Sequence, residues 1–193
     1  MSEFVLMRIE ICGGIATGKT TLCHVLSSQG FSSYCEQFQE NPFWRDFYDD
    51  PVKFAFETEL TFLLQHYNDI KKNLSISKAV FDFSLVQDLA YADVNLHEKR
   101  KSIFMTLADE LLEEIGLPTL LIYITCPPQI ALQRIHKRKR DVESSITVNY
   151  LEALNLALEQ RIVSVPNAVT VLRINSSDID FRADLPQILK NLI

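Results

Sequence analysis

The chain has 193 residues, which is enough for one domain with a sizeable core and short for two. Hydrophobic residues make up 47% of it and charged residues 23%, a balance that excludes a largely disordered chain. The 19 Lys and Arg against 25 Asp and Glu give a net charge of −6, which argues against a general nucleic-acid coat. Five of the basic residues fall within residues 134–140, so the remainder has 14 basic against 25 acidic residues, or −11. This local reversal of charge indicates a site for an anion.

Apolar runs, the first residues and the cysteines limit where the protein is located and what it binds. No apolar run reaches the length that spans a bilayer, and the first residues lack the basic start of a secretion signal. The four cysteines form no CxxC pair, so neither a disulfide scaffold nor a zinc ribbon is expected. We therefore expect a cytoplasmic protein without a membrane or nucleic-acid partner.

Short β-rich runs alternate with longer segments at helical spacing. The predicted strands are 5–12, 31–35, 79–81, 120–125 and 170–174. The predicted helices are 19–28, 51–72, 84–96, 102–115, 128–139, 147–163 and 184–192. Such alternation favours a parallel sheet with right-handed crossovers, covered by helices on both faces. Since no repeat or linker interrupts it, we expect residues 1–193 to form a single α/β domain.

A glycine-rich loop follows the first predicted strand. Residues 13–20, GGIATGKT, fit the pattern G-x-x-x-x-G-K-[ST] in full. Loops of this kind point backbone N–H groups at phosphate oxygens, and the helix that follows directs its positive end at the same anion. In such a loop the lysine neutralises the β and γ phosphates and the Thr20 hydroxyl holds Mg²⁺. The pattern predicts a nucleoside-triphosphate site formed by Gly13, Gly14, Ile15, Ala16, Thr17, Gly18, Lys19, Thr20 and Thr21.

The loop does not specify what receives the phosphate. The N-K-x-D motif that reads guanine in GTPases is absent, and the chain is short for a motor or a large ATPase. A kinase for a small molecule remains. Such an enzyme needs an acceptor pocket, a base for the acceptor hydroxyl and a basic lid over the triphosphate.

From Ile9 to Phe181 the chain resembles the deoxynucleoside kinases, especially the shorter bacterial deoxyadenosine and deoxyguanosine kinases. The resemblance implies a P-loop nucleoside-kinase fold, with a five-stranded parallel sheet flanked by helices and a basic lid. Glu36 aligns with the catalytic base of that family, which accepts the proton of the sugar 5′-hydroxyl. Gln37 replaces the proline that usually follows this base. Glu40 is a nearby competitor, but its Asn-Pro context is typical of a turn.

The resemblance also assigns an acceptor pocket. Tyr48 corresponds to a tyrosine that contacts the sugar 3′-hydroxyl. Glu59 falls where the family has a base-reading Gln, and His66 falls where it has an Arg. Trp44, Phe47 and Tyr48 at helical spacing form either an aromatic wall for a base or ordinary core.

The segment after the third predicted strand resembles the family pattern Asp/Glu-Arg-Ser. Asp82 would help to hold Mg²⁺, Ser84 matches, and Asp88 would read the base. Phe83 replaces an Arg that braces the catalytic Glu. A phenylalanine can neither neutralise charge nor donate a hydrogen bond, so an unreplaced loss of this Arg would cost about 10² in rate.

The basic cluster resembles the family's lid, R-x-x-x-R-x-R-x-x-E, with the lid expected at about residues 134–146. Arg134, Arg138 and Arg140 would stabilise the migrating phosphoryl group, with Arg138 also binding ATP, and Glu143 would cap the 3′-hydroxyl. A solvated helix face, or a patch for RNA or lipid, is the alternative. Further on, residues 175–181 resemble a loop that packs on the ATP adenine, contributed here by Asp180 and Phe181.

Together these features predict transfer of phosphate from ATP, with Mg²⁺ as cofactor, to the 5′-hydroxyl of a deoxynucleoside. Two ionised carboxylates, at Glu59 and Asp88, would favour a purine edge rich in donors, such as guanine N1–H and N2–H₂, unless one carboxylate is protonated. Two alternatives stay open: a nucleotide-binding regulatory subunit with impaired catalysis, and a kinase of another small hydroxylated metabolite. The resemblance also implies a homodimer.

Overall fold

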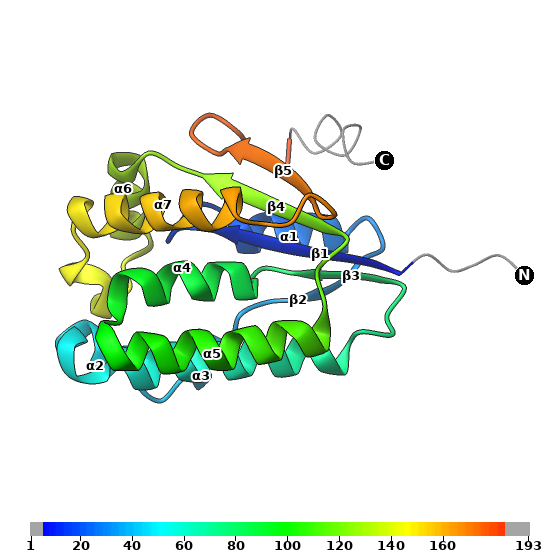
Figure 1. The fold of residues 1–193 in the computed structure, drawn as a ribbon. Coiled ribbons are helices and arrows are strands. Elements are labelled where there is room, and N and C mark those ends of the chain that lie inside the picture. Colours follow the sequence, from blue (N-terminus) through cyan, green and yellow to red (C-terminus); the bar gives the residue numbers. More distant parts are fainter. Residues whose placement is uncertain (1–5, 184–193) are drawn as a thin grey trace, which may run out of the picture.

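A computed structural model, which describes residues 6–183, places five strands in one parallel sheet of order β2-β3-β1-β4-β5 (Figure 1). The central strand pairs in parallel with both neighbours, with Ile9 opposite Val80 on one side and Leu120 on the other. The predicted α/β fold with a five-stranded parallel sheet is therefore confirmed. The strands are β1 (Met7–Gly13), β2 (Ser32–Tyr34), β3 (Lys78–Phe81), β4 (Leu120–Thr125) and β5 (Thr170–Asn175).

Six of the predicted helical segments are found close to their expected bounds, whereas the short helix at Trp44–Asp49 was not predicted. The helix expected at 184–192 lies outside the described residues. One helix starts at Glu98, four residues before the predicted 102, because its first turn is charged and shows no apolar periodicity. The α-helices are α1 (Lys19–Ser27), α2 (Trp44–Asp49), α3 (Pro51–Lys72), α4 (Leu85–Asn95), α5 (Glu98–Ile115), α6 (Pro128–Arg138) and α7 (Val148–Val163). Short 3₁₀ turns lie at Phe38–Glu40 and Asp141–Ser145.

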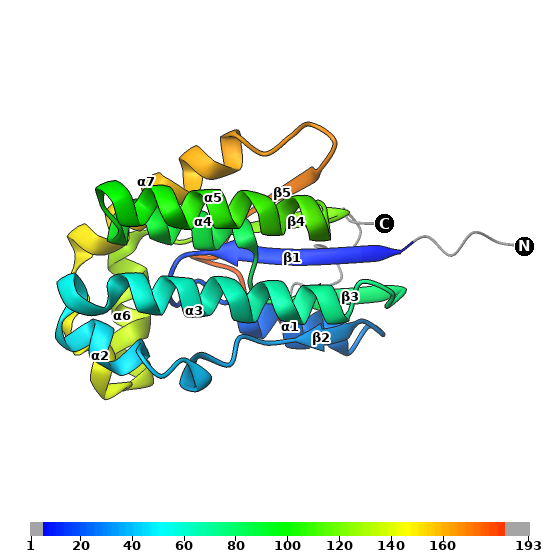
Figure 2. The ribbon, with the colours of Figure 1, turned by 60° about the horizontal axis from the view of Figure 1, so that its bottom comes forward.

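Alternation along the strands sorts the buried side chains into two layers. In β1, Ile9 and Ile11 pack with Leu22 of α1, whereas Cys12 packs on the opposite face with residues of α4 and α7. Helices α3 and α5 complete that second face beside β3 (Figure 2). Both faces of the sheet are covered, which explains why the strands are apolar runs without a polar side.

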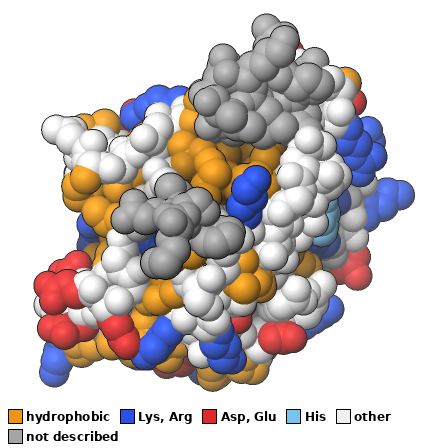
Figure 3. Space-filling view, turned by 90° about the vertical axis from the view of Figure 1, so that its right-hand side faces the viewer, with side chains coloured by type: hydrophobic (Ala, Val, Ile, Leu, Met, Phe, Trp, Pro, Cys, Tyr) orange, Lys and Arg blue, Asp and Glu red, His pale blue; other side chains and the backbone are white. Residues whose placement is uncertain are grey.

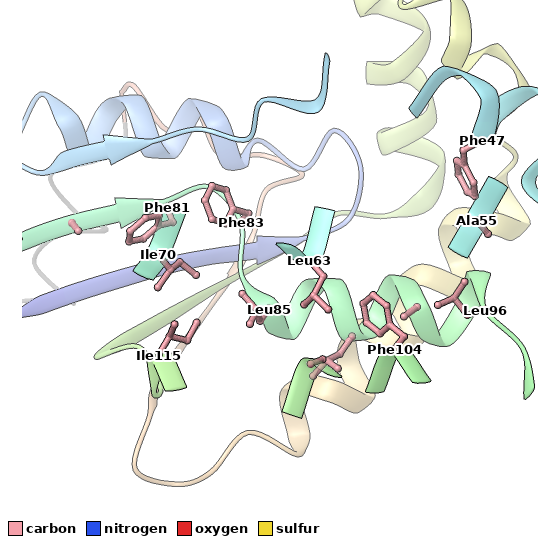
Figure 4. Packing of buried hydrophobic residues seen from close by; sticks show 14 residues of the cluster. Phe47, Ala55, Leu63, Ile70, Phe81, Phe83, Leu85, Leu96, Phe104 and Ile115 are labelled. Atoms are coloured by element: carbon pink, nitrogen blue, oxygen red, sulfur yellow. The ribbon is translucent and has the colours of Figure 1, made fainter. Parts of the chain in front are cut away.

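The core beside β3 positions the start of α4. Phe81 ends the strand, Phe83 follows it, and both are fully buried in the cluster shown in Figure 4. The Ser84 hydroxyl then caps α4 by accepting a hydrogen bond of 3.1 Å from the backbone N–H of Gln87. This cap places Asp88 in the first turn of α4, close to the carboxyl ends of the strands.

Because the strands are parallel, the loops that follow β1, β2 and β3 meet at one edge of the sheet, on the left in Figure 1. Viewed from the opposite end, the molecule shows hydrophobic side chains between scattered acidic and basic ones (Figure 3). Within residues 6–183, no helix is both long and apolar enough to cross a bilayer.

Candidate active site

A cavity of about 430 Å³ opens at the carboxyl edge of the sheet, between the glycine-rich loop, helices α2 to α4 and the lid. Five predicted site residues, Gly13, Gly14, His66, Asp180 and Phe181, are not part of its wall. The others line it: Ile15, Ala16, Thr17, Gly18, Lys19, Thr20, Thr21, Glu36, Tyr48, Glu59, Asp82, Asp88, Arg134, Arg138, Arg140 and Glu143. Residues that are far apart in the sequence are thus brought to a single cavity.

The glycine-rich loop is held in shape by its own lysine. The Lys19 Nζ donates hydrogen bonds of 3.0 Å to the carbonyl oxygens of Gly13 and Gly14. Burial lowers the pKa of Lys19 from its ordinary value, although the carboxylates of Glu36 and Asp82 act in the opposite direction. A cation at this position is poised to exchange two carbonyl contacts for phosphate oxygens.

Gly18 and Phe181 explain why the loop turns tightly at its end. The φ angle of Gly18 is 103°, and a Cβ atom there would lie 2.8 Å from Cε2 of Phe181. The Phe181 ring is buried against the α1 side of the core, so it supports the loop from behind. The structure therefore places Phe181 beneath the loop. The sequence predicted a contact of this side chain with the ATP adenine.

Asp82 links the end of β3 to the glycine-rich loop and to Glu36. Its Oδ1 accepts a hydrogen bond of 2.6 Å from the backbone N–H of Glu36, and the Thr20 hydroxyl favours its ionised form. Burial raises the pKa of Asp82 above its ordinary value, partly offset by these two groups. The Thr20 and Asp82 oxygens are hard ligands of the type that Mg²⁺ prefers when it keeps its waters and binds a nucleotide phosphate. They fit the predicted metal.

His66, behind the cavity wall, links two side chains that line the cavity, Glu36 and Asp88. The Nδ1 atom of His66 lies 2.9 Å from both carboxylate oxygens of Asp88, and its Nε2 atom lies 3.2 Å from Oε1 of Glu36. The imidazole stacks on the Phe83 ring, with centroids 4.2 Å apart and planes within 10°. The structure thus brings together two of the positions at which the acceptor pocket departs from the family, His66 and Phe83.

The pKa values of His66, Glu36 and Asp88 are all shifted from their ordinary values. Burial disfavours an imidazolium, but the adjacent Asp88 and Glu36 carboxylates outweigh it and raise the pKa of His66 to about 10. Burial alone would favour a neutral Glu36, yet His66, with Lys19, holds the pKa of Glu36 below its ordinary value. Burial raises the pKa of Asp88 despite its cationic neighbour. At neutral pH, His66 is therefore positive and Glu36 negative.

Glu59 lies deeper in the acceptor pocket and is only 4% exposed. One of its carboxyl oxygens accepts a hydrogen bond of 2.7 Å from Nδ2 of Asn95. Burial raises the pKa of Glu59 to about 8, so the carboxyl is neutral at pH 7. A neutral carboxyl has one O–H donor and one C=O acceptor, the same pair that a Gln amide presents. Glu59 can therefore do what the family's Gln does.

Aromatic side chains form much of the remaining wall of the acceptor pocket. Trp44, Phe47 and Tyr48, which the sequence singled out, line the cavity, together with Phe62 and Tyr91. The last two were missed, as was Gln87, whose Oε1 accepts a 3.2 Å hydrogen bond from the backbone N–H of Gly13. Tyr91 lies three residues after Asp88 and four after Gln87 on α4, so helical spacing was the available signal for Tyr91 and then for Gln87.

Two of the lid arginines are held by Glu143 and the third by Ser176. Arg138 donates to both Glu143 carboxylate oxygens, at 2.7 and 2.5 Å, and Arg140 lies 3.3 Å from one of them. The Arg140 guanidinium also stacks over the Phe38 ring at 4.1 Å. Arg134 is tied instead to the backbone and hydroxyl oxygens of Ser176, at 2.6 and 3.0 Å. Three guanidiniums are thereby ordered at the mouth of the cavity.

The parallel sheet, the phosphate-binding loop and the basic lid define a P-loop kinase fold. The family model described as deoxynucleoside kinase matches residues 9–191, and the chain belongs to that family. It is 32% identical over 186 residues to a deoxyguanosine kinase of Bacillus subtilis, covering 90% of this chain and 88% of that protein. It is 27% identical over 190 residues to a deoxyadenosine kinase of Dictyostelium discoideum, covering 95% and 78%.

A similar fold is found in a solved structure of deoxyadenosine kinase from M. mycoides with bound dATP. The TM-score is 0.85 at 23% identity, and the match covers 96% of this chain and 99% of that one. The P-loop nucleoside-kinase fold expected from the sequence is therefore confirmed over nearly the whole chain.

Proposed function

We propose that this protein transfers the γ-phosphoryl group of ATP to the 5′-hydroxyl of a deoxynucleoside. The observation that carries the proposal is that the Glu36 carboxylate lines the same cavity as Lys19 and Asp82. A hydroxyl bound beside Glu36 would face a triphosphate held by the glycine-rich loop. The kinases of deoxyguanosine and deoxyadenosine among its relatives support this acceptor.

In this reaction Glu36 accepts the proton of the attacking hydroxyl. Its lowered pKa keeps it ionised at neutral pH, as a general base requires. Lys19 and the lid residues Arg134, Arg138 and Arg140 stabilise the charge on the migrating phosphoryl group. Charged donors around a water-poor cavity supply most of the catalysis in phosphoryl transfer, which needs little covalent chemistry from the protein.

The Mg²⁺ that accompanies the nucleotide is assigned to Thr20 and Asp82. Bound Mg²⁺ neutralises phosphate charge and orients the leaving group. Within the described residues, no group of three or more His, Cys, Asp or Glu side chains is arranged to hold a metal ion. Two protein oxygens suit a cation whose other ligands are phosphate oxygens and water.

For the base, we propose a preference for purines. Asp88 is an acceptor and Glu59, when neutral, offers one donor and one acceptor, which suits an edge that alternates amino or imino donors with acceptors. Thymine presents a single N–H between two carbonyls and would set a carbonyl against Asp88, whereas the choice of purines over cytosine is supported by the deoxyguanosine and deoxyadenosine kinases among the relatives. Tyr48 and Glu143 are assigned to the sugar 3′-hydroxyl.

The same site weighs against the two alternatives. A regulatory subunit has no need of a cavity that retains the lysine, the carboxylate and all three lid arginines. A kinase of another metabolite has no need of an aromatic wall that suits a planar base. The homodimer, the cytoplasmic location and the single domain over residues 1–193 stay predictions from the sequence.

The proposal is tested by ADP release from ATP and Mg²⁺ with deoxyguanosine, deoxyadenosine, deoxycytidine, thymidine and free deoxyribose as acceptors. We expect turnover with the two purine deoxynucleosides, and detection of the 5′-monophosphate confirms the position of transfer. ATP binding without turnover of any nucleoside would overturn the proposal in favour of a regulatory subunit. Equal turnover of thymidine and deoxyguanosine would contradict the purine preference alone.

A further inference from the structure

His66 is a buried cation between two carboxylates that belong to different elements. It lies on α3 and is 2% exposed, and its two ring nitrogens face Asp88 on α4 and Glu36 beyond the end of β2. The contact distances are 2.9 Å and 3.2 Å. The imidazole ring therefore links Glu36, the candidate general base of the reaction, to Asp88, the candidate residue for reading the nucleobase.

The faces of the ring are fixed by aromatic neighbours. Phe83 stacks at 4.2 Å, and Phe62 lies at 5.8 Å with its plane inclined by 24°. Phe83 is itself fully buried beside Phe81 in the core, so it cannot move away (Figure 4). A ring held by its faces has only its edge left for polar contacts, and that edge carries the two nitrogens.

Other cations near the cavity are bound elsewhere. Lys19 contacts the carbonyl oxygens of its own loop, Arg138 and Arg140 pair with Glu143, and Arg134 binds Ser176. Among residues 6–183, the ion pair at Glu36 is the one with His66. Without it, the Glu36 carboxylate would have no cation at ion-pair distance among these residues, and only the longer-range charges of Lys19 and Arg140 would act on it.

We propose that His66 is a positioning residue, whose imidazolium orients the Glu36 carboxylate for the acceptor hydroxyl and ties it to Asp88, with Phe83 fixing the ring. The inference rests on the proposed function for its catalytic meaning. It explains two departures from the family together: a ring stacked on Phe83 supplies the positive charge that an arginine at residue 83 would otherwise bring to Glu36. The base and the nucleobase-reading side chain are thereby coupled.

The Nε2 contact is close but not well aligned for a hydrogen bond. Although Nε2 lies 3.2 Å from Oε1 of Glu36, it has no partner with hydrogen-bond geometry. Catalytic hydrogen bonds are often loose before substrate binds and tighten afterwards. A small rotation of Glu36, which is 28% exposed, would align the pair, whereas His66 is buried and stacked on Phe83.

The charge state of His66 follows from all the groups that face it. Two acids are in contact with it, Glu36 and Asp88; Glu59 on its own helix and Glu10 on β1 also act on it at longer range. Among the cations, Lys19 acts on both contacting carboxylates and Arg140 acts on Glu36. The two carboxylates in contact with the ring favour the imidazolium, in keeping with the pKa of about 10.

The first test is independent of turnover. In ¹⁵N-histidine-labelled protein at about pH 8, above the ordinary histidine pKa of 6.5, we expect one imidazole with both nitrogens protonated. That signal should disappear in His66→Gln. In Glu36→Gln, the Nε2 resonance of His66 should shift. A neutral His66 at this pH, or an Nε2 resonance insensitive to Glu36→Gln, would overturn the ion bridge.

The second test is kinetic and uses matched substitutions. Removing a charged contact on the base should lower kcat by about 10²-fold in His66→Gln, with the KM for ATP unchanged. His66→Arg, which keeps the charge and can stack on Phe83, should stay within about tenfold of wild type. His24→Gln, an exposed histidine of α1, should match wild type.

Folding of each variant is checked by ATP binding and thermal unfolding. A folded His66→Gln with wild-type kcat, or a folded His66→Arg no better than His66→Gln, would overturn the positioning role. If wild type turns over no nucleoside, the proposed function fails, while the labelled-histidine measurement still decides whether the ion bridge exists. The two failures are therefore distinguishable.

Discussion

Glu59 offers a direct measurement of how strongly the acceptor pocket perturbs a carboxyl group. The perturbation is Glu59→Gln, which preserves shape and keeps an oxygen to accept the hydrogen bond from Asn95. In the wild-type protein, burial raises the pKa of Glu59 to about 8 from its ordinary 4.5. The unfolded chain therefore ionises near pH 4.5 while the folded chain stays protonated until about pH 8.

The sign follows from this order of ionisation. Between the two pKa values the unfolded state releases a proton that the folded state keeps, so the wild-type protein loses stability as pH rises. The loss is about 1.4 kcal/mol per pH unit. Over the interval from pH 4.5 to pH 8, the loss of folding stability amounts to at most about 5 kcal/mol. Screening by solvent reduces this figure little, because the side chain is only 4% exposed. The Glu59→Gln variant has no such loss, because its amide does not ionise in this range.

The assay is urea unfolding of wild type and Glu59→Gln at several pH values across this interval. We expect the variant to gain stability relative to wild type steadily with pH, by several kcal/mol in total. Glu110→Gln, which removes an exposed glutamate from α5, serves as the control and should run parallel to wild type. A stability difference between Glu59→Gln and wild type that is flat across the interval would refute the buried, protonated carboxyl.

Three further substitutions test neighbouring parts of the site. Phe83→Arg should lower kcat, and it should lower Tm by about 5 °C or more, because a second buried cation would lie against His66. A gain in activity, measured by ADP release, would contradict this. Lys19→Ala should reduce turnover by about 10³-fold, and steady-state kinetics near wild type would exclude its role. Glu143→Gln should raise the nucleoside KM about tenfold in initial-rate kinetics, because Glu143 is assigned to the sugar 3′-hydroxyl and its charge also holds Arg138; an unchanged KM would exclude this role.

Local patterns were sufficient for the fold and for much of the site. The strands are apolar runs because both faces of the sheet are covered, and the glycine-rich loop, Glu36 and the lid each lie in a short motif with fixed spacing. All three line the cavity. The sequence fails where the relevant contact joins distant segments.

The stacking of His66 on Phe83 is such a contact. In the sequence the two residues look like separate losses of arginine, and nothing in their spacing shows that one ring packs on the other. The protonation of Glu59 is equally invisible, because it depends on burial that only the packed helices create. Phe181 was expected at the adenine, but its place beneath Gly18 depends on where the chain returns after β5.

The central claim is that Glu36 is the base in a phosphoryl transfer, and its most direct test is the kcat of Glu36→Gln with saturating ATP and deoxyguanosine. Glu40→Gln, an exposed neighbour in the same segment, is the matched control. We predict that Glu36→Gln lowers kcat by about 10²-fold or more with ATP binding intact, while Glu40→Gln stays at the wild-type rate. A Glu36→Gln variant within about twofold of wild type would contradict the account, since loss of a general base costs about 10²-fold or more.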